Sequence, residues 1–105
     1  MIKACYLMQR KAGMSQEAFS AYWKETHGPI VAAVPGLRKY VQNHAQATPD
    51  GNVFCDGIAE MWFDDMASFG AGMGSDQGRA LLEDARNFVE IEKSGLVLVD
   101  EIEVL

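Results

Sequence analysis

The 105-residue sequence lacks the features that mark several large classes of protein. Its 9 lysines and arginines are outnumbered by 15 acidic residues, so the formal net charge is −6 and no basic stripe is available for nucleic acid or anionic membranes. No apolar run approaches the roughly 18 residues of a membrane span, and the N-terminus has no signal-peptide pattern. We therefore expect a cytoplasmic protein that binds neither nucleic acid nor membrane.

Cysteine and histidine are also scarce, with 2 residues of each type. Cys5 and Cys55 lie in or beside apolar stretches without a CxxC motif, so we expect both thiols to be reduced and buried. His27 and His44 are far apart in the sequence, and neither belongs to an HExxH or His-x-His motif. We therefore expect no metal site and no haem.

The composition is that of one ordinary globular domain spanning residues 1–105, with 49% apolar and 23% charged residues. The hydrophobic pattern predicts four strands and two helical regions in the order βαββαβ. The strands are expected at residues 2–9, 37–45, 54–63 and 95–105.

Turn and cap residues predict the helix ends. The first helical region should begin after Ser15, a favourable N-cap. Gly28-Pro29 should stop or kink this region, because a residue before proline is disfavoured in the helical conformation, and a short helical turn should follow over 30–33. The second region, 66–92, contains three glycines within 70–74, which predicts a break near 74–75 and a helix over 76–88.

Three of the predicted strands are apolar on both faces. In the first strand, for example, Ala4 and Tyr6 lie on one face and Cys5 and Leu7 on the other. One layer of helices covers only one face of an antiparallel sheet. Because most soluble oligomers are symmetric homodimers, we expect a second copy to cover the other face, sheet against sheet.

Three titratable residues are candidates for acid–base chemistry. His27 ends a predicted helix and His44 ends a predicted strand, and imidazole exchanges protons near neutral pH. Glu60 shares a strand face with Ile58 and Trp62, where a carboxylate should be paired or protonated. The alternative is that His27 satisfies helix-end carbonyls while His44 and Glu60 point to water.

Polar residues also line one face of the second strand. Tyr40, Gln42 and His44 share this face, whereas the corresponding faces of the other strands are apolar. A polar strip inside an apolar layer indicates a lined cavity, because unpaired polar groups there would be costly. If the strip faces the helices, His27 and His44 should meet at one pocket; otherwise they should lie on opposite sides of the sheet.

Three motifs follow one another along the chain: Phe19-x-x-Tyr22-Trp23-x-x-x-His27-Gly28-Pro29, Pro35-Gly36-Leu37-x-x-Tyr40-Val41-Gln42-Asn43-His44, and Asp56-Gly57-x-Ala59-Glu60-x-Trp62-Phe63. Together they resemble the EthD family, and the resemblance covers nearly the whole chain. It implies an α+β, ferredoxin-like βαββαβ fold with an antiparallel four-stranded sheet, paired into a dimeric α+β barrel.

The resemblance also implies a type of chemistry. Proteins of this wider group carry out cofactor-free acid–base reactions on small aromatic or lactone-like molecules, as oxidoreductases, isomerases, cyclases or decarboxylases. His27 and His44 match the family's histidine-bearing motifs, and Asn43, Glu60 and Trp62 match other recurring positions. We therefore expect His27, His44 and Glu60 to be catalytic. The expected ligand pocket contains Tyr6, Trp23, Tyr40, Gln42, Asn43 and Trp62.

Three functions remain open from the sequence. The first is a cofactor-independent enzyme acting on a small hydrophobic carbonyl, phenol or lactone in catabolism or polyketide-like metabolism. The second is a non-catalytic ligand-binding or accessory protein for a partner oxidoreductase, and the third is a structural homodimer with a vestigial pocket. Catalysis is favoured if both imidazoles and Glu60 open onto one enclosed cavity. An exposed His27 beside a cavity filled by side chains would favour the binding function or the structural function.

Overall fold

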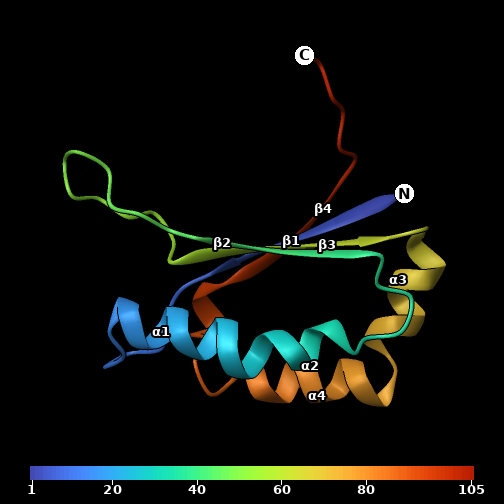
Figure 1. Cartoon of the computed structure of the whole chain (residues 1–105), viewed down its shortest axis with the longest axis horizontal. Helices are drawn as coiled ribbons and strands as arrows, with labels where there is room; N and C mark the ends of the chain where they lie inside the picture. Colours follow the sequence, from blue (N-terminus) through green and yellow to red (C-terminus); the bar gives the residue numbers. More distant parts are fainter.

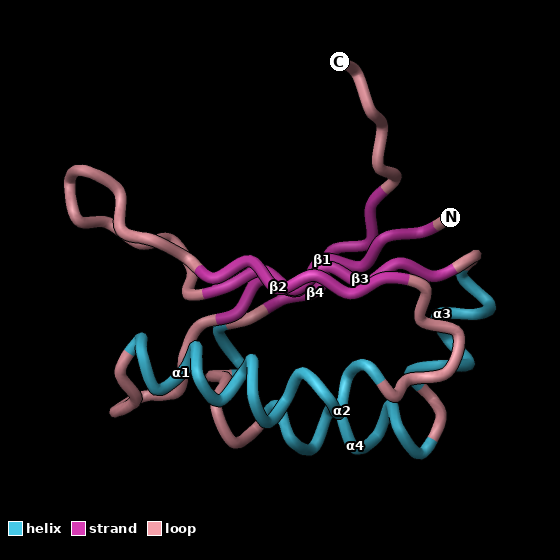
Figure 2. Tube along the Cα trace, in the orientation of Figure 1, coloured by secondary structure: helices cyan, strands magenta, loops and turns pink.

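A four-stranded antiparallel sheet forms one layer of the protein, and the helices form a second layer on one of its faces (Figure 1). In the computed structural model, which describes all 105 residues, the strands are β1 (Ile2–Met8), β2 (Lys39–His44), β3 (Gly57–Phe63) and β4 (Gly95–Val99), in the spatial order β2-β3-β1-β4. The predicted α+β fold and its βαββαβ order are confirmed. Figure 2 shows that no element of the chain covers the other face of the sheet.

The first helical region contains α1 (Gln16–Tyr22), a π-helical turn (Trp23–His27) and α2 (Gly28–Ala32). Ser15 caps α1 as predicted, because its hydroxyl accepts a hydrogen bond from the Ala18 amide. The expectation that Gly28 leaves helical angles is wrong, since its φ and ψ are −51° and −51° and its N–H bonds to the Trp23 carbonyl. The wider π turn makes room for the Pro29 ring, which would clash with the preceding turn of a regular α-helix.

The second helical region divides as predicted, into α3 (Met66–Met73) and α4 (Asp76–Ala85). Two of its glycines are required by close packing. A Cβ at Gly72 would lie 2.6 Å from the Pro35 carbonyl oxygen, and one at Gly78 would lie 2.2 Å from the Met73 carbonyl oxygen. α4 ends three residues before the predicted end, and a short 3₁₀ helix (Ile91–Lys93) leads into β4.

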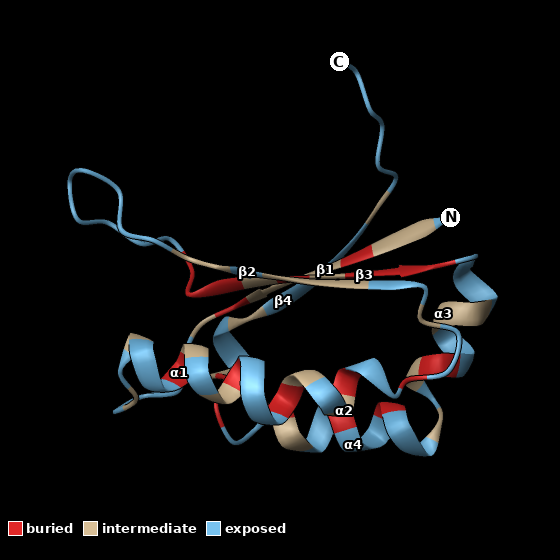
Figure 3. Cartoon of the chain, in the orientation of Figure 1, coloured by how far each residue is buried: buried red, intermediate tan, exposed pale blue.

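The strands are shorter than the sequence pattern predicted. β4 ends at Val99 rather than Leu105, because its register pairs Val99 with Lys3 and leaves residues 102–105 beyond the start of β1. β3 begins at Gly57 rather than residue 54, and Phe54 is 89% exposed in the preceding loop. Figure 3 shows both the C-terminal residues and this loop as exposed segments that extend away from the helices.

The core lies between the sheet and the helices. Its largest fully buried side chains are Trp23, Phe19, Phe63, Phe88 and Met8. Burying a side chain of this size contributes about 1.5–3 kcal/mol to folding. None of the helices is both long and apolar enough to span a membrane.

The uncovered face of the sheet, which we call the open face, carries the odd-numbered residues of β1 and β4. Val97 is 49% exposed on it, and Cys5 is half-buried beside Val97 in the strand pairing. The expectation that Cys5 is a core residue is therefore wrong for the single chain, whereas Cys55 is buried.

Candidate functional site

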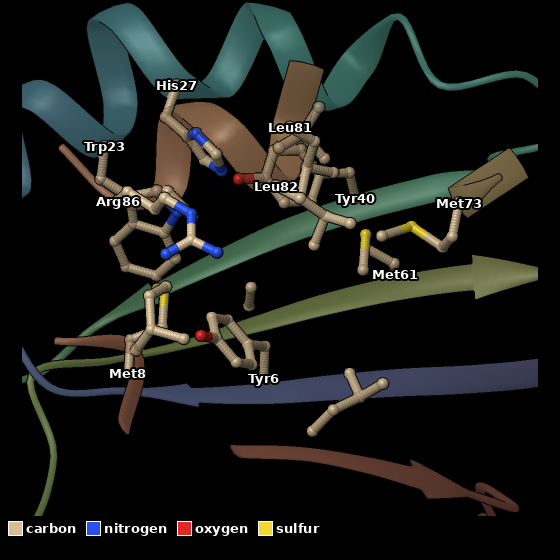
Figure 4. Close-up of a pocket in the computed structure, with 15 residues that line it drawn as sticks. Tyr6, Met8, Trp23, His27, Tyr40, Met61, Met73, Leu81, Leu82 and Arg86 are labelled. Atoms are coloured by element: carbon tan, nitrogen blue, oxygen red, sulfur yellow. The ribbon is translucent and has the colours of Figure 1, made fainter. Parts of the chain in front are cut away.

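A cavity of about 270 Å³ lies between the helix-facing side of the sheet and the helix layer (Figure 4). Of its 15 lining residues 13 are hydrophobic, and the two exceptions are His27 and Arg86. The exposed lining residues mark the mouth of the cavity: Leu82, Arg86, Ile91 and Leu96. Because small-molecule sites usually measure roughly 300–1,000 Å³, this cavity suits a small apolar ligand.

His27 ends the π-helical turn and is only 5% exposed. Its Nδ1 lies 2.7 Å from Oδ2 of Asp84, on α4. Burial lowers the pKa of His27, and the nearby Asp84 carboxylate offsets only part of that effect. The ring is therefore neutral at pH 7, and the carboxylate, which can only accept, places the proton on Nδ1.

The other ring nitrogen of His27, Nε2, has no partner within the protein. Every fully buried side-chain nitrogen or oxygen in the structure has a hydrogen-bond partner, so Nε2 is reached from the cavity. Figure 4 shows the ring projecting from the helix layer toward the cavity. His27 thus presents an unprotonated nitrogen to any molecule bound there.

Asp84 is fixed by two further donors. The Tyr22 hydroxyl lies 2.6 Å and the Asn87 amide nitrogen 3.1 Å from its Oδ1. Burial would raise the pKa of Asp84, but the hydrogen bonds from Tyr22, His27 and Asn87 outweigh it and lower the pKa. The carboxylate is therefore ionised and rigidly held, which fixes both the orientation and the tautomer of His27.

Sequence reasoning missed Asp84. It lies among other polar residues of α4, a pattern that is typical of a solvated helix face. Only the packing of α4 against the first helical region brings it to His27.

His44 faces the helix layer together with Tyr40 and Gln42, but it does not line the cavity. Its ring centroid lies 4.3 Å from that of Trp23, which does line the cavity. Burial lowers the pKa of His44, and the charge of Lys24 adds to this shift. The polar strip therefore faces the helices. The expectation that His27 and His44 would then meet at one pocket is wrong, because His44 does not line the cavity.

The polar strip instead ties β2 to the π-helical turn. The Gln42 amide nitrogen donates to the Trp23 carbonyl at 3.0 Å and to the Tyr40 hydroxyl at 2.8 Å. Its oxygen lies 2.9 Å from Nε2 of His44. Trp23 also packs on Gly57, where a Cβ would come within 2.5 Å of the indole. These contacts fix the Trp23 side chain as one wall of the cavity.

The remaining predicted site residues lie on the open face. Asn43 donates to Glu60 at 2.9 Å, and Glu60 also pairs with Lys3, so the pKa of Glu60 is lowered chiefly by Lys3 and then by Asn43. The Trp62 indole donates to Glu101 at 3.1 Å. Glu60 is thus paired, as expected of a carboxylate on that face, but it does not open onto the cavity. The structure does not bring His27, His44 and Glu60 together.

Of the nine predicted site residues, four line the cavity: Tyr6, Trp23, His27 and Tyr40. Gln42 and His44 lie next to its wall, and Asn43, Glu60 and Trp62 lie on the opposite side of the sheet. No group of three or more His, Cys, Asp or Glu side chains is placed to hold a metal ion.

A four-stranded antiparallel sheet with one layer of helices in the order βαββαβ defines the class of ferredoxin-like proteins. The EthD domain model matches residues 11–92, so the chain belongs to the EthD family. An ethyl tert-butyl ether d (EthD) family protein from Bacillus halodurans is 27% identical, with a TM-score of 0.83, and the match covers 97% of this chain and 99% of that one. No curated protein matches the chain.

More distant structures share the fold. A dimeric ferredoxin-like protein of unknown function from Thermobifida fusca is 17% identical with a TM-score of 0.73, over 93% of this chain and 88% of that one. SnoaB, a cofactor-independent oxygenase from Streptomyces nogalater, is 12% identical with a TM-score of 0.69, over 99% of this chain and 95% of that one. The ferredoxin-like fold predicted for the chain is thus confirmed.

Proposed function

We propose that the protein is a small cofactor-independent enzyme in which His27 transfers a proton to or from a small hydrophobic carbonyl, phenol or lactone-like molecule. One observation carries the proposal: a neutral histidine, oriented by an ionised aspartate 2.7 Å away, presents its free nitrogen to an apolar cavity. A base with these properties can accept a proton near neutral pH. The cofactor-independent oxygenase SnoaB, which shares the fold, supports cofactor-free chemistry.

The proposed step is a simple proton transfer. His27 Nε2 accepts a proton from an acidic C–H or O–H bond of the ligand, and the electron pair of that bond remains on the ligand as an enolate or phenolate. Asp84 stabilises the imidazolium that forms, and the same His27 returns the proton to a different atom or to water. The apolar lining keeps water away from the reacting atoms and strengthens these electrostatic interactions.

In this account His44 and Glu60 do not transfer protons. We assign His44 to positioning, because its ring packs on the Trp23 indole at the cavity wall. We assign Glu60 to the open face, because it pairs there with Lys3 and Asn43.

The experiment is proton–deuterium exchange at the acidic carbon of 2-tetralone, a small fused-ring ketone, followed by NMR in D₂O. The native protein should accelerate the exchange, and His27→Asn should lower the acceleration by roughly 10²–10⁴-fold, the usual contribution of one acid–base group. His44→Asn removes the imidazole that packs on Trp23 outside the cavity, so it should lower the acceleration much less than His27→Asn does. Equal acceleration by the native protein and His27→Asn would refute the proposal.

A second candidate function is supported by the near absence of polar groups in the cavity. With His27 and Arg86 as its only non-hydrophobic lining residues, the cavity can hold a ligand without transforming it, as a non-catalytic binding or accessory protein for a partner oxidoreductase would. Tight binding of 2-tetralone with no acceleration of exchange would favour this function over the first.

We also propose that the protein forms a homodimer through the open face. Val97 is 49% exposed there, and Leu7 and Ile58 are half-buried beside it, although no part of the chain covers them. The dimeric ferredoxin-like protein from Thermobifida fusca supports a dimer for this fold. Light scattering at micromolar concentration should give twice the chain mass of 11.5 kDa.

A further inference from the structure

Arg86 is the one cationic residue that lines the cavity, and nothing in the protein neutralises it. It directly follows the last residue of α4, and its exposed side chain borders the mouth. The guanidinium takes part in none of the six ion pairs of the structure and in none of its side-chain hydrogen bonds. The arginine within α4, Arg79, is by contrast paired with Asp76 and bonded to the Gly74 carbonyl.

The nearest acidic residue on the same helix end is already occupied. Asp84 accepts hydrogen bonds from His27, Tyr22 and Asn87, so it is committed to the histidine side of the cavity. A second positive charge lies close by, because the Lys11 ammonium donates to the Arg86 carbonyl at 3.0 Å. The Arg86 guanidinium is therefore an unpaired positive charge at the mouth of the cavity, in a chain whose net charge is −6.

The direction of the side chain matters as much as its charge. Figure 4 shows the Arg86 guanidinium lying over the cavity between Trp23 and Tyr6, on the same side as the His27 ring. A guanidinium offers a planar fork of N–H donors that matches the two oxygens of a carboxylate. An apolar ligand that fills the cavity would place a group at its mouth within reach of this fork.

We propose that Arg86 selects ligands that carry a carboxylate at one end of a small hydrophobic or aromatic body. The body fills the apolar cavity, and the carboxylate accepts hydrogen bonds from Arg86 at the mouth. Anchoring the carboxylate at the mouth fixes which atoms of the ligand lie beside His27. This inference rests on the proposed ligand cavity, and it narrows the substrate class from any small hydrophobic molecule to an amphipathic acid.

The test uses two probes of the same shape, 2-naphthoate and 2-naphthamide, which differ in charge. Isothermal titration calorimetry of the native protein should give tighter binding of the carboxylate than of the amide. Arg86→Gln should weaken 2-naphthoate binding by at least about 10-fold, the size of one charge-assisted hydrogen bond, and leave 2-naphthamide binding unchanged. Arg79→Gln, on the same helix but outside the cavity, is the control and should change neither.

Two outcomes would overturn the inference. One is equal 2-naphthoate affinity in the native protein and Arg86→Gln; the other is an equal loss for both probes, which would show that Arg86 only supports the cavity wall. If neither probe bound to the native protein, the inference would be overturned as well. Because binding is measured without turnover, a selective loss for 2-naphthoate would stand even if His27→Asn left proton exchange unchanged, so the two proposals fail separately.

Discussion

The Asp84 carboxylate lies 2.7 Å from Nδ1 of His27, although the two residues are 57 positions apart and belong to different helices. This contact gives the buried imidazole a fixed tautomer and leaves its other nitrogen to the cavity. Without Asp84, neither ring nitrogen of His27 would have a hydrogen-bond partner in the protein to fix the position of its proton.

We predict that Asp84→Asn lowers the pKa of His27 further. The carboxylate raises this pKa against the larger effect of burial, so its removal leaves burial unopposed. The measurement is an NMR titration of the His27 ring protons between pH 4 and 8. Asp76→Asn, which removes an exposed carboxylate at the other end of α4, should leave the His27 titration unchanged. An unshifted His27 in Asp84→Asn would contradict the electrostatic account.

The same burial predicts how stability depends on pH. In the folded protein the pKa of His27 is lower than its ordinary value of 6.5, so the unfolded chain binds more protons between these two values. Stability from this group is therefore fully present above pH 6.5 and is lost as the pH falls from 6.5 toward the folded pKa. Urea unfolding at pH 7, 6 and 5 should show this loss, and His27→Gln should reduce it. An identical pH dependence in the variant would argue against a depressed pKa.

Two glycine substitutions should have opposite effects on stability. Gly57→Ala places a Cβ within 2.5 Å of the Trp23 indole, which is fully buried and cannot move freely. We expect a loss of about 1–3 kcal/mol, as for other overpacked cores. Gly70→Ala, in the exposed interior of α3 with no atom within 4 Å, should instead stabilise the protein by about 0.5–1 kcal/mol. Chemical denaturation measures both, and a stable Gly57→Ala would show that Trp23 is loosely held.

Charge on the open face should prevent dimerisation. Val97→Asp places a carboxylate on a side chain that is 49% exposed in the single chain, so the protomer should still fold. In the proposed dimer the same carboxylate would be buried without a partner at a cost of several kcal/mol. Light scattering should therefore report a monomer for Val97→Asp. Ala21→Asp, on the exposed side of α1, should remain a dimer, and a native protein that is monomeric would refute the interface.

Much of the fold could be predicted because the signals are local. Alternation in the strands, the cap Ser15 and the glycine break near Gly74 each depend on a few neighbouring residues, and the structure confirms them. The extent of β4 could not be predicted, because it depends on the register with β1 and not on the apolar pattern of its own residues. The only sequence signal for the π-helical turn is Gly28-Pro29, and this dipeptide is equally compatible with the end of a helix.

The candidate site could be predicted only in part. His27, Trp23, Tyr6 and Tyr40 could be predicted from residue type and from the motifs that resemble the EthD family, and all four line the cavity. The sequence does not tell which of the two histidines reaches the cavity, because this depends on the packing of Trp23, which lines the cavity and lies against His44. Asp84 and Arg86 could not be predicted, because one lies near the end of α4 and the other directly follows it, where charged residues look like an ordinary solvated face.

The central claim is that His27 acts as the base of the cavity, and the pH dependence of 2-tetralone exchange tests it most directly. In the native protein the rate should rise with pH below 6.5 and become constant once His27 is deprotonated, with a midpoint equal to the NMR pKa of His27. His44→Asn should keep the same midpoint, because it removes no proton-transfer group from the cavity, and His27→Asn should lose this pH dependence. A rate that rises in proportion to hydroxide across the whole range, or a profile that is unchanged in His27→Asn, would contradict the claim.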